Sequence, residues 1–205
     1  MRFSLLALVI FAAAGRALAQ PAASSSDSPK PGDLVTNPTY ALWAGFAVGT
    51  SVTQKEAVTL ADGSIVESLT TARLVSKHPD RLTVETTVAP LDAAKRAGVI
   101  DETKTLVIYH SEAPFEEFQT PESAGYSVTK GKEVLEVRGK AMEAEWIEAN
   151  TSTSDGSVTE KDWYAVEVPG GLVKQTVTKK KGEQITSQST LELVDMKIKH
   201  EAKKE

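Results

Sequence analysis

The chain has 205 residues, a formal net charge of −5 and no cysteine. Without cysteine it has no disulfide framework, thiolate metal ligand or cysteine nucleophile, so burial alone must hold the fold together. The acidic balance argues against a nucleic-acid partner, because neutralising phosphates needs a basic surface.

Residues 1–19 have the pattern of a secretory signal peptide. Arg2 precedes an apolar run, and Ala17-Leu18-Ala19 gives the small-x-small pattern that signal peptidase accepts. The apolar run is about ten residues long, which is short for a stable transmembrane helix, and an uncleaved anchor is the alternative. We therefore expect cleavage before Gln20, export to the periplasm or the extracellular space, and a mature protein that is not integral to a membrane.

The mature chain is expected to contain one folded domain, residues 37–198, between two unstructured ends. Residues 20–36 are rich in Ser, Pro and Ala and have little to bury, which is typical of a flexible linker. Residues 199–205 are mostly charged and are expected to form a disordered tail.

The domain opens with the sequence NPTYALWAGF, which predicts a short helix. Asn37 suits the N-cap, and Pro38 suits the first helical position. Tyr40 and Trp43 then lie on one helical face, which we expect to dock on a sheet. The alternative is that this aromatic face lines a binding cleft.

Residues 49–89 predict three antiparallel strands separated by the turns ADGS and KHPDR. In the third strand Leu82 and Val84 alternate with Arg81 and Thr83. One face of this strand is apolar and the other polar, as in an antiparallel sheet that is wetted on one side.

The remaining chain is again mostly strand. A helix is expected over residues 90–98, a strand over 103–110 and a loop over 111–126. In the last third, residues 150–157 predict a long polar connection between strands. The sequence therefore predicts a mainly β protein: a single curved antiparallel sheet or half-barrel of about nine strands, with one or two short helices.

The stretch DWYAVEVPGGLVKQTVTKKKGEQITSQSTLELV predicts three strands separated by two turns. The first strand is expected over residues 163–168, with Tyr164 on one face and Trp163 on the other. Gly170 and Gly171 permit the positive φ that the following tight hairpin requires. Trp163 lies on the mixed face, where we expect the N-terminal helix to cover it; the alternative is that a ligand reaches it.

The sequence contains no recognisable catalytic, metal or cofactor motif. The three histidines are far apart, and no G-x-S-x-G elbow, zinc motif or phosphate loop is present, so we expect no cofactor. Glu143 and Glu145 would share one face of a strand about 7 Å apart, a spacing found in glycosidase sites and on ordinary wet sheet faces alike. A hydrolase that uses these acids is the less favoured hypothesis.

The final third combines an aromatic pair, a Pro-Gly-Gly turn, a lysine, a glycine hairpin and an apolar strand. These are Trp163-Tyr164, Pro169-Gly170-Gly171, Lys174, Gly182 and Leu191–Val194. The combination resembles exported bacterial proteins of unknown function with a LolA/LppX-like domain, the lipoprotein-carrier type. Members of that superfamily fold as an open half-barrel with helices on the concave side, and some carry acyl chains there. The resemblance implies a LolA-like curved sheet and an apolar ligand.

Together these observations predict an exported, non-enzymatic protein of the cell envelope. It is expected to bind a lipid or another apolar ligand, or an envelope protein, in or beside the concave face of its sheet. A structural or interaction module without a small-molecule site is the alternative. The aromatic residues proposed for ligand or partner binding are Trp43, Trp146, Trp163 and Tyr164.

Overall fold

The computed structural model describes residues 29–91, 103–118, 126–154 and 156–199. In these ranges the chain forms mostly strands, with one short α-helix and one 3-10 helix. In chain order the elements are β1 (Leu34–Thr36), α1 (Pro38–Ala44), β2 (Ser51–Leu60), β3 (Ile65–Lys77), β4 (Arg81–Pro90), β5 (Thr103–His110), β6 (Glu112–Pro114), η2 (Phe115–Phe118), β7 (Tyr126–Val137), β8 (Lys140–Thr153), β9 (Gly156–Tyr164), β10 (Leu172–Lys181) and β11 (Gln184–Lys197).

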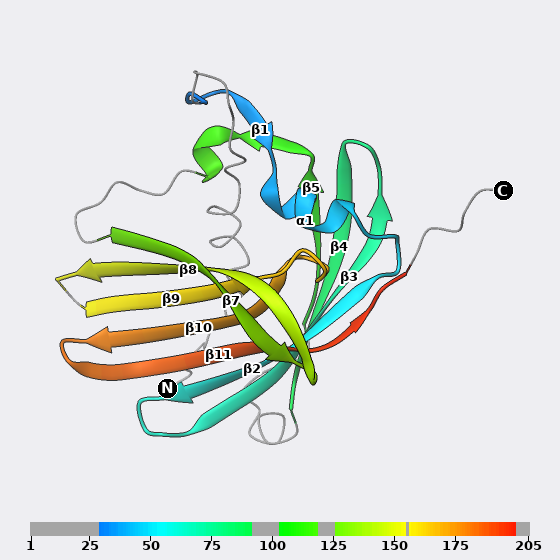
Figure 1. Cartoon of the computed structure of the whole chain (residues 1–205). Coiled ribbons are helices and arrows are strands. Elements are labelled where there is room, and N and C mark those ends of the chain that lie inside the picture. The colour runs from blue at the N-terminus through cyan, green and yellow to red at the C-terminus, as the bar shows by residue number, and fades with distance from the viewer. Residues whose placement is uncertain (1–28, 92–102, 119–125, 155, 200–205) are drawn as a thin grey trace.

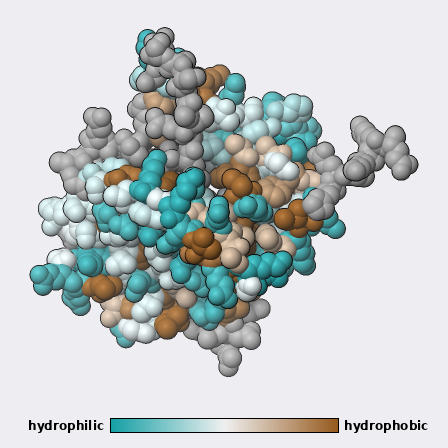
Figure 2. All heavy atoms as spheres, in the orientation of Figure 1, coloured by the Kyte–Doolittle hydropathy of each residue, from teal (hydrophilic) through white to brown (hydrophobic). Residues whose placement is uncertain are grey.

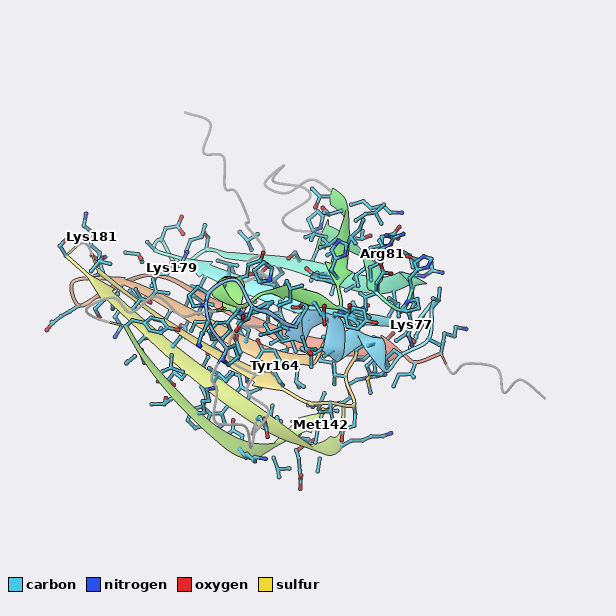
Figure 3. All side chains as sticks on the ribbon, turned by 90° about the horizontal axis from the view of Figure 1, so that it is seen from above. Lys77, Arg81, Met142, Tyr164, Lys179 and Lys181 are labelled. Carbon is cyan, nitrogen blue, oxygen red and sulfur yellow. The ribbon has the colours of Figure 1, made fainter. Side chains whose placement is uncertain are left out.

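Nine strands form one antiparallel sheet in the order β5-β4-β3-β2-β11-β10-β9-β8-β7. The sheet is strongly curved and is not closed into a barrel, so β5 and β7 are its two edges (Figure 1). Seen from above, α1 lies inside the curve, with Lys179 and Lys181 at one end of the sheet and Lys77 and Arg81 at the other (Figure 3). The predicted fold, a curved antiparallel sheet of about nine strands with few helices, is confirmed.

The sheet consists of two meanders that meet where β11 pairs with β2. Gly63, in the turn between β2 and β3, and Gly182, in the turn between β10 and β11, both have positive φ. At the first turn Asp62 Oδ1 accepts hydrogen bonds from the backbone N and the hydroxyl of Ser64, at 2.9 and 2.6 Å. The hairpin predicted from the sequence ADGS is therefore confirmed.

Short elements near the β1–β6 pair differ from the sequence prediction. Residues 34–36, expected in the linker, form β1 because they pair with β6. The loop expected over 111–126 begins with β6 and η2. Of the helix expected over 90–98, Pro90 instead ends β4, and residues 92–98 lie outside the described residues.

Two hairpins of the C-terminal meander also differ from the prediction. Strand β9 ends at Tyr164 and not at Val168, because Ala165 N donates to Gly171 O at 2.9 Å and starts a turn. The long connection expected over 150–157 is reduced to a short hairpin, since β8 and β9 pair almost to their ends.

Helix α1 forms as predicted and closes one end of the curved sheet. Asn37 Oδ1 accepts hydrogen bonds from the backbone N of Thr39 and Tyr40, at 2.9 and 3.3 Å, and so caps the helix. Trp43 is buried in a core made with β2, β3, β4, β10, β11 and the turn after β9. The other buried residues of this core are Val52, Ala72, Leu74, Leu82, Val84, Ala165, Val168, Val173 and Leu193.

We call the side of the sheet on which α1 packs the inner face and the opposite side the outer face. Val52 marks the inner face on β2, and Glu56 shares that face because side chains alternate along a strand. Cross-strand pairing extends the same face to Gln175 on β10 and Asp162 on β9. Trp163, the next residue along β9, therefore belongs to the outer face.

Candidate functional site

A row of polar residues crosses the inner face. Cross-strand pairs connect, from β3 to β8, the residues Ser68, Glu56, Leu191, Gln175, Asp162 and Ile147. Gln54 and Thr70 form the adjacent pair on β2 and β3, one step nearer to α1. Ser68, Gln54, Thr70 and Asp162 are all buried. Burying polar groups is unfavourable unless they find partners, so this row is unusual for the middle of a sheet.

Asp162 is the deepest acid in this row, with 4% of its surface exposed. Its Oδ2 accepts a long hydrogen bond of 3.4 Å from the Tyr164 hydroxyl, whereas Oδ1 has no partner within the described part of the chain. Burial, followed by the charge of Glu160, raises the pKa of Asp162 from 3.8 to about 7, and hydrogen bonds from Gln175 and Tyr164 offset this only in part. The carboxyl group therefore exchanges its proton near neutral pH.

Two more acids on the inner face have raised pKa values. Glu160, two residues earlier on β9, accepts a hydrogen bond from Gln175 Nε2 at 2.8 Å. Burial raises the pKa of Glu160, while the Gln175 hydrogen bond and the charge of Lys179 lower it. Burial also raises the pKa of Glu56 on β2. Each shift indicates a carboxylate that is only partly solvated.

A second row, one step further from α1, is mainly apolar. Cross-strand pairs connect, from β3 to β7, the residues Val66, Val58, Ser189, Val177, Glu160, Ala149 and Val128. All seven are partly exposed. The inner face therefore offers solvent an apolar band that contains Glu160 and lies next to the buried Asp162.

Trp146 and Trp163 are cross-strand partners on the outer face. The Lys161 Nζ lies 4.2 Å from the Trp146 ring centroid and 4.7 Å from that of Trp163, and the Lys174 Nζ lies 5.7 Å from the latter. Trp163 Nε1 also donates a hydrogen bond to the Glu133 carboxylate, and its ring is buried. Trp163 is thus covered, but by charged side chains from β7, β9 and β10; the expected cover by the N-terminal helix is wrong.

The four aromatic residues proposed for binding do not form one site. Trp43 and Tyr164 are buried on the inner side, next to the turn that contains Gly171. Trp146 and Trp163 lie on the outer face, where Lys161 sits between their rings. A binding role for any of the four stays a prediction.

The acids proposed for the alternative hydrolase lie on an exposed part of β8. Glu145 forms an ion pair of 2.7 Å with Lys132, and Glu143 is exposed. Among the residues described, no group of three or more His, Asp or Glu is placed to hold a metal ion. No helix in the described ranges has the length and apolar character to cross a bilayer.

The sequence reasoning missed Asp162, Glu160 and Gln175. A signal was present, because alternation along β9 puts both acids on the same face as Tyr164, whose ring is large and apolar. The sequence could not show that this face would be the covered one.

No family model matches the chain, and no curated protein matches it. Several solved structures, among them the following three, align with most of its length. A Bacteroides fragilis protein with a YmcC-like fold, described as exported, is 13% identical over 74% of this chain and 97% of its own, with a TM-score of 0.42.

Two further structures are similar over most of the chain. A Parabacteroides distasonis protein described as a lipoprotein is 13% identical over 74% of this chain and 96% of its own, with a TM-score of 0.40. A Vibrio parahaemolyticus domain described as an outer membrane lipoprotein-sorting protein is 10% identical over 80% of this chain and 91% of its own, with a TM-score of 0.29. These are proteins of the kind that the sequence resemblance names, but at such identities and TM-scores the likeness carries no argument about function.

Proposed function

We propose that the protein is exported and acts in the cell envelope as a non-enzymatic binding protein that holds an apolar ligand against the inner face of its sheet. The observation that carries this proposal is the partly exposed apolar band from Val66 on β3 to Val128 on β7. A purely structural sheet would bury such a band, and a wet face would carry charged side chains there.

The small size of α1 supports this proposal. The helix has seven residues and packs at one end of the inner face, and the apolar band at the far side of this face stays partly exposed. The sheet is open, since β5 and β7 do not pair with each other. A ligand can therefore reach the inner face from the side opposite α1 without breaking a strand pair.

The lining sets limits on the ligand. Half-buried acids and buried hydroxyl and amide groups border the apolar band, so the inner face is not lined by apolar side chains alone. Ligand sites of this kind bind an apolar body and fix its orientation through a few polar groups. The ligand that fits best is an amphiphile, whose polar group lies toward α1.

Purification of the mature protein from its native host, followed by mass spectrometry of extracted small molecules, tests the proposal. The expected result is a co-purifying amphiphile that a heat-denatured sample releases, together with an N-terminus at Gln20. A protein that carries no small molecule and does not enhance the fluorescence of an apolar dye would contradict ligand binding. Recovery from the cytoplasm with residues 1–19 intact would contradict export.

A protein partner is the second candidate, and one observation favours it. Leu106 and Ile108 on the edge strand β5 are 62% and 57% exposed, which is unusual for large apolar residues in a sheet. In Figure 2, other apolar residues lie scattered among hydrophilic ones on the visible face. Cross-linking in the native envelope with a photoreactive residue at position 106 tests this candidate, and recovery of the free monomer alone would contradict it.

A further inference from the structure

We propose that the ligand of the inner face carries a primary ammonium group, which Asp162 and Glu160 bind while the apolar band holds the attached chain. This inference rests on the proposed function and specifies the chemistry of its ligand. It starts from an imbalance between hydrogen-bond donors and acceptors at the junction of β9 and β10.

Acceptors outnumber donors at this junction. Asp162 and Glu160 together present four carboxylate oxygens, and the donors beside them are the Gln175 amide and the Tyr164 hydroxyl. The amide of Gln54, on the same face, donates instead to the backbone oxygen of Leu172 at 2.7 Å. Asp162 Oδ1 is left without a partner in the described part of the chain, although Asp162 is 96% buried. A buried carboxylate oxygen in this state is costly unless a donor reaches it.

The charge at this junction favours a cationic donor. Glu160 and Asp162 lie two residues apart on β9, and the charge of Glu160 acts on Asp162, whereas Lys179 is the basic residue whose charge acts on Glu160. A primary ammonium supplies three donors and one positive charge, which matches two neighbouring carboxylates. Hydrogen bonds between ionised groups are stronger than neutral ones, so ammonium is favoured over a hydroxyl.

An organic cation fits better than a metal ion. Calcium takes six to eight oxygen ligands, usually with several carboxylates among them. The described residues place no group of three acids or histidines within reach of one ion. An ammonium group needs only two or three acceptors, which Asp162 and Glu160 supply.

The surroundings of the two acids specify the rest of the ligand. Glu160 lies in the apolar band itself, between Val177 on β10 and Ala149 on β8. Asp162 lies one step deeper, between Gln175 and the apolar Ile147. An ammonium group at these acids therefore directs an attached alkyl chain along the partly exposed band, away from α1.

Titration of the purified full-length mature protein with three matched probes tests the proposal. The probes are dodecylamine, dodecanol and dodecanoate at pH 8, each kept below its aggregation concentration, with displacement of an apolar fluorescent dye as the readout. We expect dodecylamine to bind about ten- to a hundredfold more tightly than dodecanol, as one or two charge-assisted hydrogen bonds would give. Dodecanoate should bind more weakly than dodecanol, because its charge repels the acids.

Variants identify the residues that cause the preference. Asp162→Asn and Glu160→Gln should each reduce the preference for dodecylamine by about tenfold while dodecanol affinity stays within about twofold. Glu192→Gln is the matched control, because this exposed acid pairs with Lys174 on the outer face at 3.0 Å and should leave all three affinities unchanged. Circular dichroism of each variant checks that it is folded.

The outcomes separate this inference from the proposed function. Equal binding of dodecylamine and dodecanol would overturn the ammonium site and leave ligand binding standing. The same holds if Glu192→Gln weakens dodecylamine as strongly as Asp162→Asn does. If none of the three probes displaces the dye, or if the dye itself does not bind, the proposed function fails together with the ammonium site.

Discussion

The indole of Trp43 packs directly on Gly170: a β-carbon at Gly170 would lie 2.9 Å from Trp43 Nε1 and 3.1 Å from Cε2. The backbone supports the same contact, because Gly170 N donates to the Leu42 carbonyl at 3.2 Å. Helix α1 is thus fixed to the turn after β9, a segment more than a hundred residues away in sequence. This contact closes the core at one end of the inner face.

Gly170→Ala should destabilise the protein strongly. Gly170 has a φ of 76°, which costs an alanine about 1–2 kcal/mol, and the clash with Trp43 adds about 1–3 kcal/mol. The matched control is Gly182→Ala, whose φ is 60° and whose new β-carbon meets nothing within 4 Å. In urea unfolding, Gly170→Ala should lower the free energy of unfolding by at least about 1 kcal/mol more than Gly182→Ala does. Equal losses would contradict the contact.

Gly131 should be required for the position of Trp146. A β-carbon at Gly131 would lie 2.5 Å from Trp146 Cζ2, so Gly131→Ala should displace the ring and lower the free energy of unfolding by about 1–3 kcal/mol. The control is Gly45→Ala, at the C-cap of α1, where φ is −74° and nothing lies within 4 Å. That variant should be unchanged or more stable by a few tenths of a kcal/mol. A tryptophan emission spectrum that is identical in wild type and Gly131→Ala would contradict the prediction.

Lys161 should stabilise the tryptophan pair through its charge. Lys161→Met keeps an unbranched apolar side chain of similar length and removes the ammonium group above Trp146 and Trp163, which should cost about 1–2 kcal/mol for two cation–π contacts. Lys180→Met, at an exposed position on β10, is the control and should cost less than about 0.5 kcal/mol. In 1 M salt the difference in thermal stability between Lys161→Met and Lys180→Met should decrease only slightly, since the Lys161 side chain is partly buried. Equal stabilities of the two variants would rule out a contribution from the cation.

Asp162 should make the stability of the unliganded protein fall as pH rises. Its pKa is about 7 in the folded protein and near 3.8 in the unfolded chain, so between these values the folded state holds a proton that the unfolded state has released. The free energy of unfolding should therefore decrease from about pH 4 to about pH 7, by at most about 4 kcal/mol from this group. Above about pH 7 the loss is complete.

Asp162→Asn isolates this effect. Glu56 and Glu160 also have raised pKa values and contribute in the same direction, but they remain in the variant. Urea unfolding of both proteins from pH 4 to pH 8 should show a smaller decrease for Asp162→Asn. Parallel curves would mean that Asp162 is better solvated or better partnered than the structure shows.

The sequence was sufficient to predict the architecture. The signals that predicted it are local, because each depends on only a few neighbouring residues. The structure confirms the alternation of Leu82 and Val84, the turn at Asp62-Gly63 and the helix start at Asn37-Pro38. The absence of cysteine and of catalytic motifs was also readable directly, because these are properties of composition and spacing. The sequence predicted the ends of strands less well. Strand β9, for example, ends at Tyr164 because a hydrogen bond within the following turn replaces strand pairing.

The candidate site was decided by tertiary structure. Alternation shows that Asp162 and Trp163 point to opposite faces, but only the packing of α1 shows which face is covered, and it covers that of Asp162. Likewise the sequence expected α1 over Trp163, whereas curvature of the sheet placed charged neighbours from β7, β9 and β10 on its ring. The physical reason is the distance in sequence over which the interactions act. Strands and turns follow from the preferences of neighbouring residues, whereas burial and shifted pKa values depend on which strands and which helix, far apart in sequence, pack together.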